Sequence, residues 1–176
     1  VCGLDVTKTD IADISDYVGS VFQNPRTQFF NTDTDSEIVF GLENRALPQE
    51  KLKMCLEKTS RELNLSALRK RNIFELSGGE KQKIAFASVY ATESEIFVLD
   101  EPSSNLDMGA IEELTDLLQR VKAQGKTIII AEHRLWYLMD VADRVVYMHG
   151  GKILKDMTLT DFQALPESEI LAMGLR

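Results

Sequence analysis

The sequence predicts an α/β fold with a mostly parallel sheet and an inserted helical subdomain. Two short apolar runs, residues 96–99 and 127–131, flank an amphipathic helical pattern over residues 111–123. Strand, helix and strand in this order favour parallel strands joined by right-handed crossovers. A longer helical stretch with Leu and charged residues precedes them, which indicates helices added to the sheet.

The other elements follow from local patterns along the chain. Residues 1–6 read as a strand and turn, and the β-rich run 17–22 ends in a polar loop at Gln23. We expect a core formed by residues 1–27 and 92–176, and a helical part formed by residues 28–91. The remaining predictions are helices over residues 36–68, 80–91, 135–141 and 160–173, and strands over residues 144–148 and 152–154.

Composition and charge exclude some classes of partner. The net charge is −8 and the pI is about 4.8, so diffuse attraction to nucleic acid or anionic lipid is not expected. The short basic run at residues 69–71 is interpreted as a solvated helix end. Cys2 and Cys55 fit no metal or redox spacing and are predicted to be free thiols of a cytosolic protein. The apolar runs are too short to span a bilayer.

Two adjacent carboxylates, Asp100 and Glu101, follow the apolar run 96–99. The carboxyl end of a parallel strand is where α/β folds bind ligands, and unpaired carboxylates are costly there. Asp100 is suited to hold Mg²⁺ through water, and Glu101 to orient or deprotonate an attacking water. The alternative is a strand that simply runs into an acidic loop.

The second motif is the run Leu76-Ser77-Gly78-Gly79-Glu80. Glycines before a helix permit a close backbone approach, and the helix start offers free N–H groups to an anion. The Ser77 hydroxyl adds a donor. An ordinary Ser/Gly helix cap is the alternative.

The order of these motifs resembles the ABC ATPase family, whose fold is a RecA-like P-loop NTPase core, here partial, with an inserted helical subdomain. A histidine after a strand is usually a solvated or capping residue, but this one stands where the family carries its switch histidine. The matched positions are Gln23 (Q-loop), residues 76–80 (signature motif, with Glu80 where many members carry Gln), residues 96–101 (Walker B), Ser104, Asn105 and Asp107 (D-loop) and His133 (switch).

The resemblance implies ATP hydrolysis with Mg²⁺ at composite sites. In one half of each site Glu101 would polarise water, His133 would contact the γ-phosphate, and Gln23 would touch the metal and the water. Asp100 would be the other metal ligand. The rate enhancement would come mainly from positioning and charge stabilisation.

The other half of each composite site would come from a partner. The resemblance implies a head-to-tail dimer with a second ATPase domain, separate or fused to the same chain. Across it, Ser77, Gly78, Gly79 and Glu80 would bind the partner's nucleotide, and Asp107 would link the two sites.

The phosphate-gripping loop G-x-x-x-x-G-K-S/T has no match in the chain. Gly125-Lys126-Thr127 comes nearest, but Arg120 stands where the first glycine belongs, and the run precedes a strand instead of opening a helix. We therefore predict a helix cap at Gly125, a strand 96–99 that with its neighbours is short of a pairing partner, and little nucleotide binding or activity by this chain alone. We also expect the native chain to extend beyond both ends.

A finer resemblance concerns residues 21–25, 28–30 and 39–44, which are similar to ATPases of energy-coupling-factor (ECF) and cobalt-type importers. It implies uptake of a vitamin or transition-metal ion, no nucleic-acid partner, and a peripheral location on the cytoplasmic face of the membrane. A transmembrane subunit would dock beside Gln23, with Phe29, Phe30 and Phe40 lining the groove or buried in the core.

Two rival functions stay open. One is a soluble ABC ATPase of DNA repair or chromosome maintenance, although such proteins usually carry coiled-coil or zinc insertions that this sequence lacks. The other is a non-hydrolytic partner domain that supplies only the signature motif. The missing phosphate loop favours that role, whereas the intact Glu101 and His133 oppose it.

Overall fold

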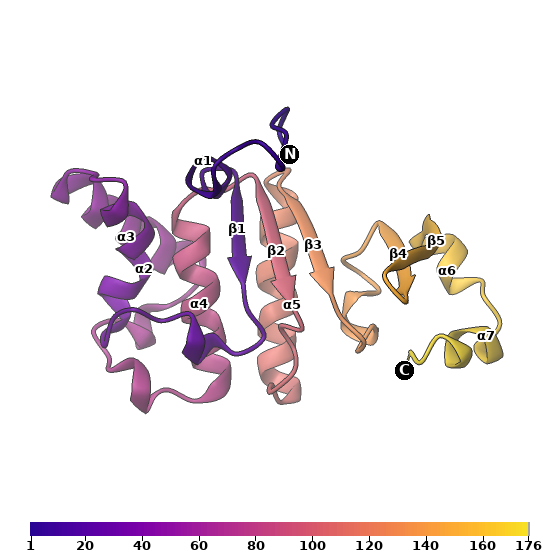
Figure 1. Ribbon diagram of the computed structural model, residues 1–176. Coiled ribbons are helices and arrows are strands. Elements are labelled where there is room, and N and C mark those ends of the chain that lie inside the picture. The colour runs from indigo at the N-terminus through magenta and orange to yellow at the C-terminus, as the bar shows by residue number, and fades with distance from the viewer. Residues whose placement is uncertain (176) are drawn as a thin grey trace. The chain divides into compact units, whose positions relative to one another are not determined.

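The computed structural model of the chain describes residues 1–175 and confirms the α/β class (Figure 1). The chain divides into two compact units, Val1–Ala131 and Glu132–Arg176. The first unit holds the parallel sheet and most of the helices, and the second holds a small antiparallel sheet. The candidate site residues therefore belong to two units, with His133 in the second.

The sheet of the first unit is parallel and has the order β1-β2-β3, with bounds β1 Val18–Val21, β2 Ile96–Asp100 and β3 Thr127–Ala131. Ile96 pairs with Val18 on one side and with Thr127 on the other. The strands point the same way in Figure 1, so their carboxyl ends share one edge. The prediction of a missing partner is wrong for residues 96–99 themselves, because β2 is the central strand. Its neighbours β1 and β3 each pair on one side only among the described residues.

Helices join and cover these strands. The predicted helical run 36–68 is divided, since Ala46 has a positive φ of 54° and Pro48 begins a new helix as its cap. Gly125, with φ +77°, follows the end of α5 as expected of a helix cap. The helical elements of this unit are α1 Ile11–Ser15, η1 Pro25–Thr27, α2 Thr34–Asn44, α3 Gln49–Glu62, η2 Ser66–Leu68, η3 Ile73–Glu75, α4 Gly78–Ala91 and α5 Met108–Ala123.

The core of the unit lies between the sheet and the helices α4 and α5. Phe86 of α4 stacks on Phe97 of β2 with ring centroids 5.8 Å apart, and Leu118 of α5 is fully buried. The strand β2 alternates fully buried and half-buried residues. The prediction of a second buried strand is wrong for β3, where Ile129 is 54% exposed because β3 is an edge strand.

The amino-terminal segment also differs from the prediction. Residues 1–6 form turns and no strand, with Leu4 N donating to Val1 O and Thr7 N to the Asp5 carboxylate. The short helix α1 follows them, although the sequence shows no apolar periodicity there. Local hydrogen bonds within turns therefore take the place of the hydrogen bonds to a neighbouring strand that a β-strand needs.

The second unit pairs β4 Arg144–His149 with β5 Lys152–Thr158 in an antiparallel hairpin. The helix predicted over residues 135–141 is only the 3₁₀ turn η4 Trp136–Leu138, and the predicted terminal helix is split by Pro166 into α6 Leu159–Gln163 and α7 Glu167–Ala172.

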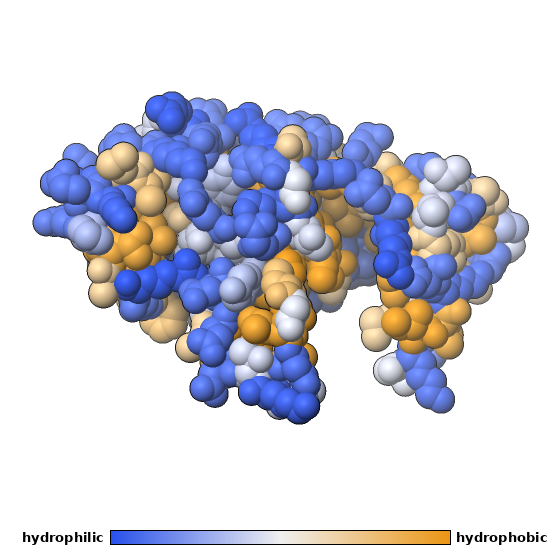
Figure 2. All heavy atoms as spheres, turned by 90° about the horizontal axis from the view of Figure 1, so that it is seen from above, coloured by the Kyte–Doolittle hydropathy of each residue, from blue (hydrophilic) through white to orange (hydrophobic). Residues whose placement is uncertain are grey.

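Hydrophilic residues cover most of the face seen in Figure 2, and groups of exposed hydrophobic residues lie between them. None of the described helices has the length and apolar composition needed to cross a membrane.

Candidate active site

The carboxyl edge of the parallel sheet brings Gln23 and Glu101 together. Gln23 follows β1, and its side-chain Nε2 donates a hydrogen bond of 2.6 Å to Oε2 of Glu101, which follows β2. Asp100 is the exposed last residue of β2 and pairs with Ala131 of β3. The amide of Gln23 and the two carboxylates therefore lie at the sheet edge where the sequence predicts the reaction.

The backbone of Glu101 adopts an uncommon conformation. Its φ is +40°, a left-handed value that costs a non-glycine residue free energy. Glu101 N donates to Ala131 O at 2.8 Å, and Ser104 N donates to Glu101 O at 3.0 Å. The turn after β2 is therefore held from both sides, which fixes where the Glu101 side chain begins.

The signature segment, residues 76–80, begins helix α4 with a capping box. Ser77 Oγ accepts from Glu80 N at 3.2 Å, and Glu80 Oε2 accepts from Ser77 N at 2.7 Å. Gly78 and Gly79 form the first turn, two residues earlier than the predicted helix start. The hydrogen bond from Ser77 N is the main cause of a lowered pKa of Glu80, with Arg71 adding to it. Glu80 is thus an ionised carboxylate at this helix start.

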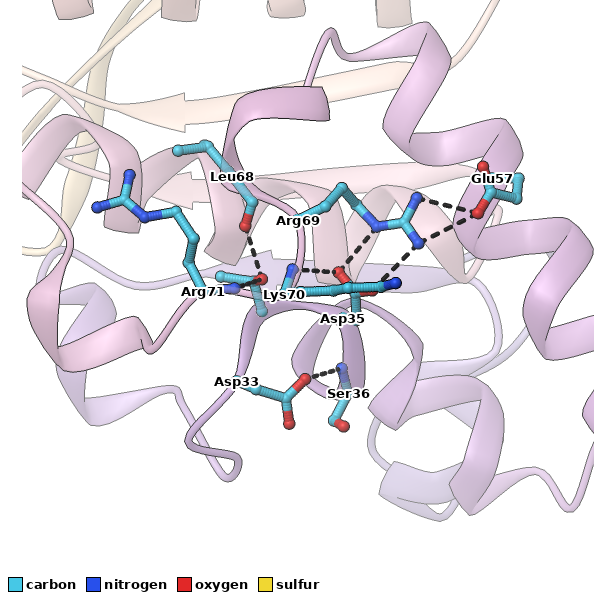
Figure 3. Close-up of polar contacts among 9 residues, drawn as sticks. Asp33, Asp35, Ser36, Glu57, Leu68, Arg69, Lys70 and Arg71 are labelled. Atoms are coloured by element: carbon cyan, nitrogen blue, oxygen red, sulfur yellow. Dashed lines mark hydrogen bonds and ion pairs between the residues drawn. The ribbon is translucent and has the colours of Figure 1, made fainter.

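The basic run at residues 69–71 is not the solvated helix end that its composition predicts. The Arg69 guanidinium binds both carboxylate oxygens of Asp35, at 2.8 and 3.1 Å, and also binds Glu57 (Figure 3). Arg71 Nη1 donates to Glu80 Oε1 at 3.0 Å. The two arginine side chains join helices α2 and α3 and the signature segment, while Lys70 is exposed.

Thr34 and Arg71 tie the segment after the Q-loop to the segment before the signature. The buried Thr34 Oγ1 donates to Leu68 O at 2.7 Å and accepts from Arg71 N at 3.2 Å, and Thr34 N donates to Arg71 O at 3.0 Å. The buried Glu37 holds the same loop, since its Oε2 accepts from Phe30 N and Asn31 N. Neither Thr34 nor Glu37 was singled out by sequence, because the helical pattern does not reveal distant partners.

The D-loop segment, residues 103–107, leads from β2 into α5. Asp107 is the cap of α5, and its Oδ1 accepts from Ala110 N at 2.9 Å. Asn105 Nδ2 donates to Ser104 Oγ at 3.3 Å. A side chain added at Gly78 would come within 3.4 Å of Asn105 O, so the signature and D-loop segments of this chain are neighbours.

His133 lies in the second unit, in the segment just before η4. Its backbone N donates to Glu132 Oε2 at 2.9 Å, while Tyr137 donates its hydroxyl to Glu132 Oε1 at 2.9 Å. The Glu132 side chain is buried and that of His133 is 57% exposed. Glu132 therefore organises the backbone around His133, a role that no pattern in the sequence indicates.

A cavity of about 290 Å³ lies away from these residues. Its lining includes Glu95, which precedes β2, and Lys126, which precedes β3, so it opens at the amino ends of the strands. Lys126 pairs with Glu95 at 2.9 Å, and Lys58 pairs with Glu93 at 2.5 Å. Because its charges are paired with one another, the cavity does not carry the chemistry expected at the opposite edge.

The donor set at the carboxyl edge fits Mg²⁺ bound together with a nucleotide. Asp100 offers carboxylate oxygens, and Gln23 offers its amide oxygen because its nitrogen donates to Glu101. Within residues 1–175 no group of three or more His, Cys, Asp or Glu side chains forms a metal-binding cluster. Mg²⁺ characteristically takes only one or two carboxylates and completes its shell with phosphate oxygens and water.

Comparisons with known proteins agree with this arrangement. The family model described as ABC transporter matches residues 1–104. A protein of Treponema denticola named as an ABC transporter ATP-binding protein is 65% identical over 174 residues, covering 99% of this chain and 36% of that protein. One of Methanosarcina mazei with the same name is 37% identical over 174 residues, covering 98% of this chain and 30% of that protein.

A solved structure of an ABC transporter protein has a similar fold. CbiO1 from Clostridium perfringens, described as part of the ABC transporter complex CbiONQ, has a TM-score of 0.82 and 28% identity. The alignment covers 96% of this chain and 66% of that one. The chain spans about a third of the length of the curated relatives it matches. Because the family model covers more than half of the chain, the chain belongs to the ABC transporter family, among relatives named as ATP-binding proteins.

Proposed function

We propose that this chain is part of the ATP-binding and ATP-hydrolysing component of an ECF-type ABC importer. The observation that carries the proposal is the 2.6 Å hydrogen bond between Gln23 Nε2 and Glu101 Oε2 at the carboxyl edge of the parallel sheet. It holds a carboxylate and an amide together where α/β folds bind ligands. The likeness to CbiO1, which belongs to a CbiONQ complex, supports the importer class.

In this proposal each residue at the sheet edge acts on water or on the metal. Glu101 orients an attacking water and accepts its proton, and Gln23 holds the Glu101 carboxylate and contacts the same water. Asp100 and the Gln23 amide oxygen hold Mg²⁺, which when bound neutralises phosphate charge. His133, from the second unit, contacts the γ-phosphate.

The signature and D-loop segments serve a second site. Ser77, Gly78 and Gly79 present the N–H groups of the α4 start, and the Ser77 hydroxyl, to the nucleotide of a second ATPase domain. Glu80 closes the capping box that holds this end in place. The D-loop residues Ser104, Asn105 and Asp107 link the two sites in a head-to-tail dimer.

The partners and location follow from the importer class. A transmembrane subunit docks beside Gln23, near Phe30, which is 75% exposed and stacks on Phe40 at 4.7 Å. The protein then sits peripherally on the cytoplasmic face of the membrane and powers uptake of a vitamin or transition-metal ion. Because the relatives are about three times longer, we infer that the complete protein carries further segments, including a phosphate loop, and that this chain is inactive alone.

Substitution of Glu101 tests the hydrolytic part of the proposal. In the full-length protein, Glu101→Gln should lower the rate of phosphate release from ATP by about 100-fold or more, because a general base is lost. Nucleotide affinity should stay close to that of the wild type, since Gln keeps the size and the hydrogen bond to Gln23. Glu112→Gln, at an exposed position of α5, is the control and should leave the rate unchanged. An unchanged rate in Glu101→Gln would refute the assignment.

The importer part has a separate test. A strain without the protein should take up a labelled vitamin or transition-metal ion more slowly, and the wild-type protein, but not Glu101→Gln, should restore uptake. Restoration of uptake by Glu101→Gln would show that transport does not depend on this hydrolysis.

A further inference from the structure

The first turn of α4 and the first turn of α5 approach each other more closely than side chains permit. A Cβ atom built on Gly79 would lie 2.8 Å from the Cβ of Ala110, a distance that real Cβ atoms essentially never show. The Cβ of Ala110 cannot rotate away, because it is fixed to the backbone. Gly79 is therefore needed for this contact even when no ligand is considered.

Both sides of the contact are held by independent bonds. On α4, the Ser77–Glu80 capping box fixes the first turn. On α5, the Asp107 cap bonds to the N–H of Ala110 itself at 2.9 Å. One turn further along both helices, Lys83 of α4 pairs with Glu113 of α5 at 2.6 Å. A shift of either helix to accommodate a methyl group at Gly79 would disturb these bonds.

The space beside the contact is too small to accept an added methyl group. The hollow between the two helices measures about 10 Å³ and is lined by Gly79, Gln82 and Ala110 among others. This is about the space that one water-sized probe fills, and it is too small to absorb both an added methyl group and its displaced neighbour. Overpacking of this kind is expected to move the backbone.

We propose that Gly79 is a positioning residue whose missing side chain seats the start of α4 on Ala110, so that the signature and D-loop segments of one chain move as one body. The inference rests on the proposed function for its consequence in ATP hydrolysis, and on the geometry alone for the contact. A displacement of residues 103–107 by a partner is then passed directly to the N–H groups that bind the partner's phosphate. This adds a second reason for glycine at position 79, besides close approach to a ligand.

A second-site substitution separates the two reasons. In the full-length protein, Gly79→Ala should lower kcat/KM for ATP by about tenfold, as expected for overpacking by one methyl group at this contact. Ala110→Gly removes the opposing methyl group on α5, so the kcat/KM of Gly79→Ala/Ala110→Gly should be at least about threefold higher than that of Gly79→Ala alone. If Gly79 served only to let phosphate approach, Ala110→Gly would not rescue activity, and the proposal would be wrong.

The matched control is Gly109→Ala, which also adds a methyl group to the first turn of α5. The nearest atom to a Cβ at Gly109 is Asp107 Oδ1 at 3.7 Å, an ordinary contact, so activity should be unchanged. A loss in Gly109→Ala as large as that in Gly79→Ala would show a general intolerance of this turn and would overturn the specific contact.

Amide hydrogen exchange keeps the contact testable if the protein hydrolyses no ATP. Gly79→Ala should speed exchange at residues 103–107 as well as at residues 77–80, and Ala110→Gly should reverse both changes. Exchange that changes only at residues 77–80 would refute the joint movement. Absence of ATP hydrolysis in the wild type, with exchange behaving as expected, would count against the proposed function and not against the contact.

Discussion

At the residue scale, three carboxylates at the start of α2 have different partners. Asp33 caps the helix by accepting from Ser36 N at 3.0 Å. Asp35 binds the Arg69 guanidinium and Lys70 N, and the buried Glu37 binds the backbone of the preceding loop (Figure 3 shows the first two). The sequence predicts acidic residues at a helix start, but it does not distinguish a cap from a tertiary clamp. Only Asp35 bonds to a distant segment of the chain, whereas Glu37 holds the loop just before its own helix.

The clamp at Asp35 makes stability depend on acid pH. Burial acts to raise the pKa of Asp35, but the hydrogen bonds and charge of Arg69, with Lys70 N, outweigh it, so the pKa lies below its ordinary value. A carboxylate with a lowered pKa in the folded state stabilises the protein fully above its unfolded pKa of about 4. That stabilisation is lost as the pH falls through the folded pKa.

Replacing Asp35 with Asn tests this reasoning. In urea titrations of the full-length protein at pH 7, Asp35→Asn should lower the free energy of unfolding by about 1–3 kcal/mol, because a charged hydrogen-bond acceptor is lost. Between about pH 5 and pH 2 the variant should lose less stability than the wild type. Asp13→Asn, at an exposed position of α1, should behave like the wild type. Parallel loss of stability in Asp35→Asn and wild type would contradict the clamp.

At the element scale, helix α4 packs directly on strand β1. A Cβ at Gly19 would lie 2.1 Å from Cγ1 of Val89 and 3.1 Å from Oγ of Ser94. Val89 and Ser94 are both buried, and a valine in a helix has one strongly preferred rotamer. The close approach of helix and strand therefore needs glycine at position 19. It also seats β1, and with it Gln23, against the rest of the sheet.

A double-mutant cycle measures this packing. Gly19→Ala should lower the free energy of unfolding of the full-length protein by about 1–3 kcal/mol through overpacking. Val89→Ala removes the opposing methyl groups, so the double variant should be more stable than the sum of the single effects by about 1 kcal/mol or more. Gly109→Ala serves as the control, and should be neutral or stabilising by up to about 1 kcal/mol. Strictly additive effects of Gly19→Ala and Val89→Ala would show that they do not collide.

At the scale of the whole molecule, the candidate site residues form separate groups in different parts of the chain. Gln23, Asp100 and Glu101 gather at the carboxyl edge of the sheet in the first unit, where Gln23 and Glu101 are bonded. The signature segment stands on the D-loop segment of the same unit, and His133 belongs to the second unit. The chain has no match to the phosphate loop that would complete a nucleotide site.

The missing loop leads to a prediction for the chain taken alone. Isothermal titration of residues 1–176 with ATP and Mg²⁺ should give no measurable binding at micromolar concentration, because the N–H groups and lysine that hold the phosphates are absent. The full-length protein, titrated in the same way, should bind ATP. Micromolar affinity in the isolated chain would mean that other residues grip the phosphates, and would contradict the proposed division of the site.

The sequence by itself determined the class of fold, most strands and helices, the helix cap at Gly125 and the order of the motifs. These features depend on short-range patterns, since apolar periodicity and capping residues act within a few positions of the chain. The exceptions are where local pattern was a poor guide, as in the split helical run after Asn44 and the exposed strand β3.

Only the tertiary structure decided which of these residues meet. Gln23 and Glu101 are 78 positions apart, and their bond exists because parallel strands deliver both to one sheet edge. The same holds for Gly79 against Ala110 and for Arg71 against Glu80, where the local sequence around each residue does not indicate its partner. Contacts between segments depend on how elements pack, and packing is set by the shape and register of the whole unit, which no local window of sequence contains.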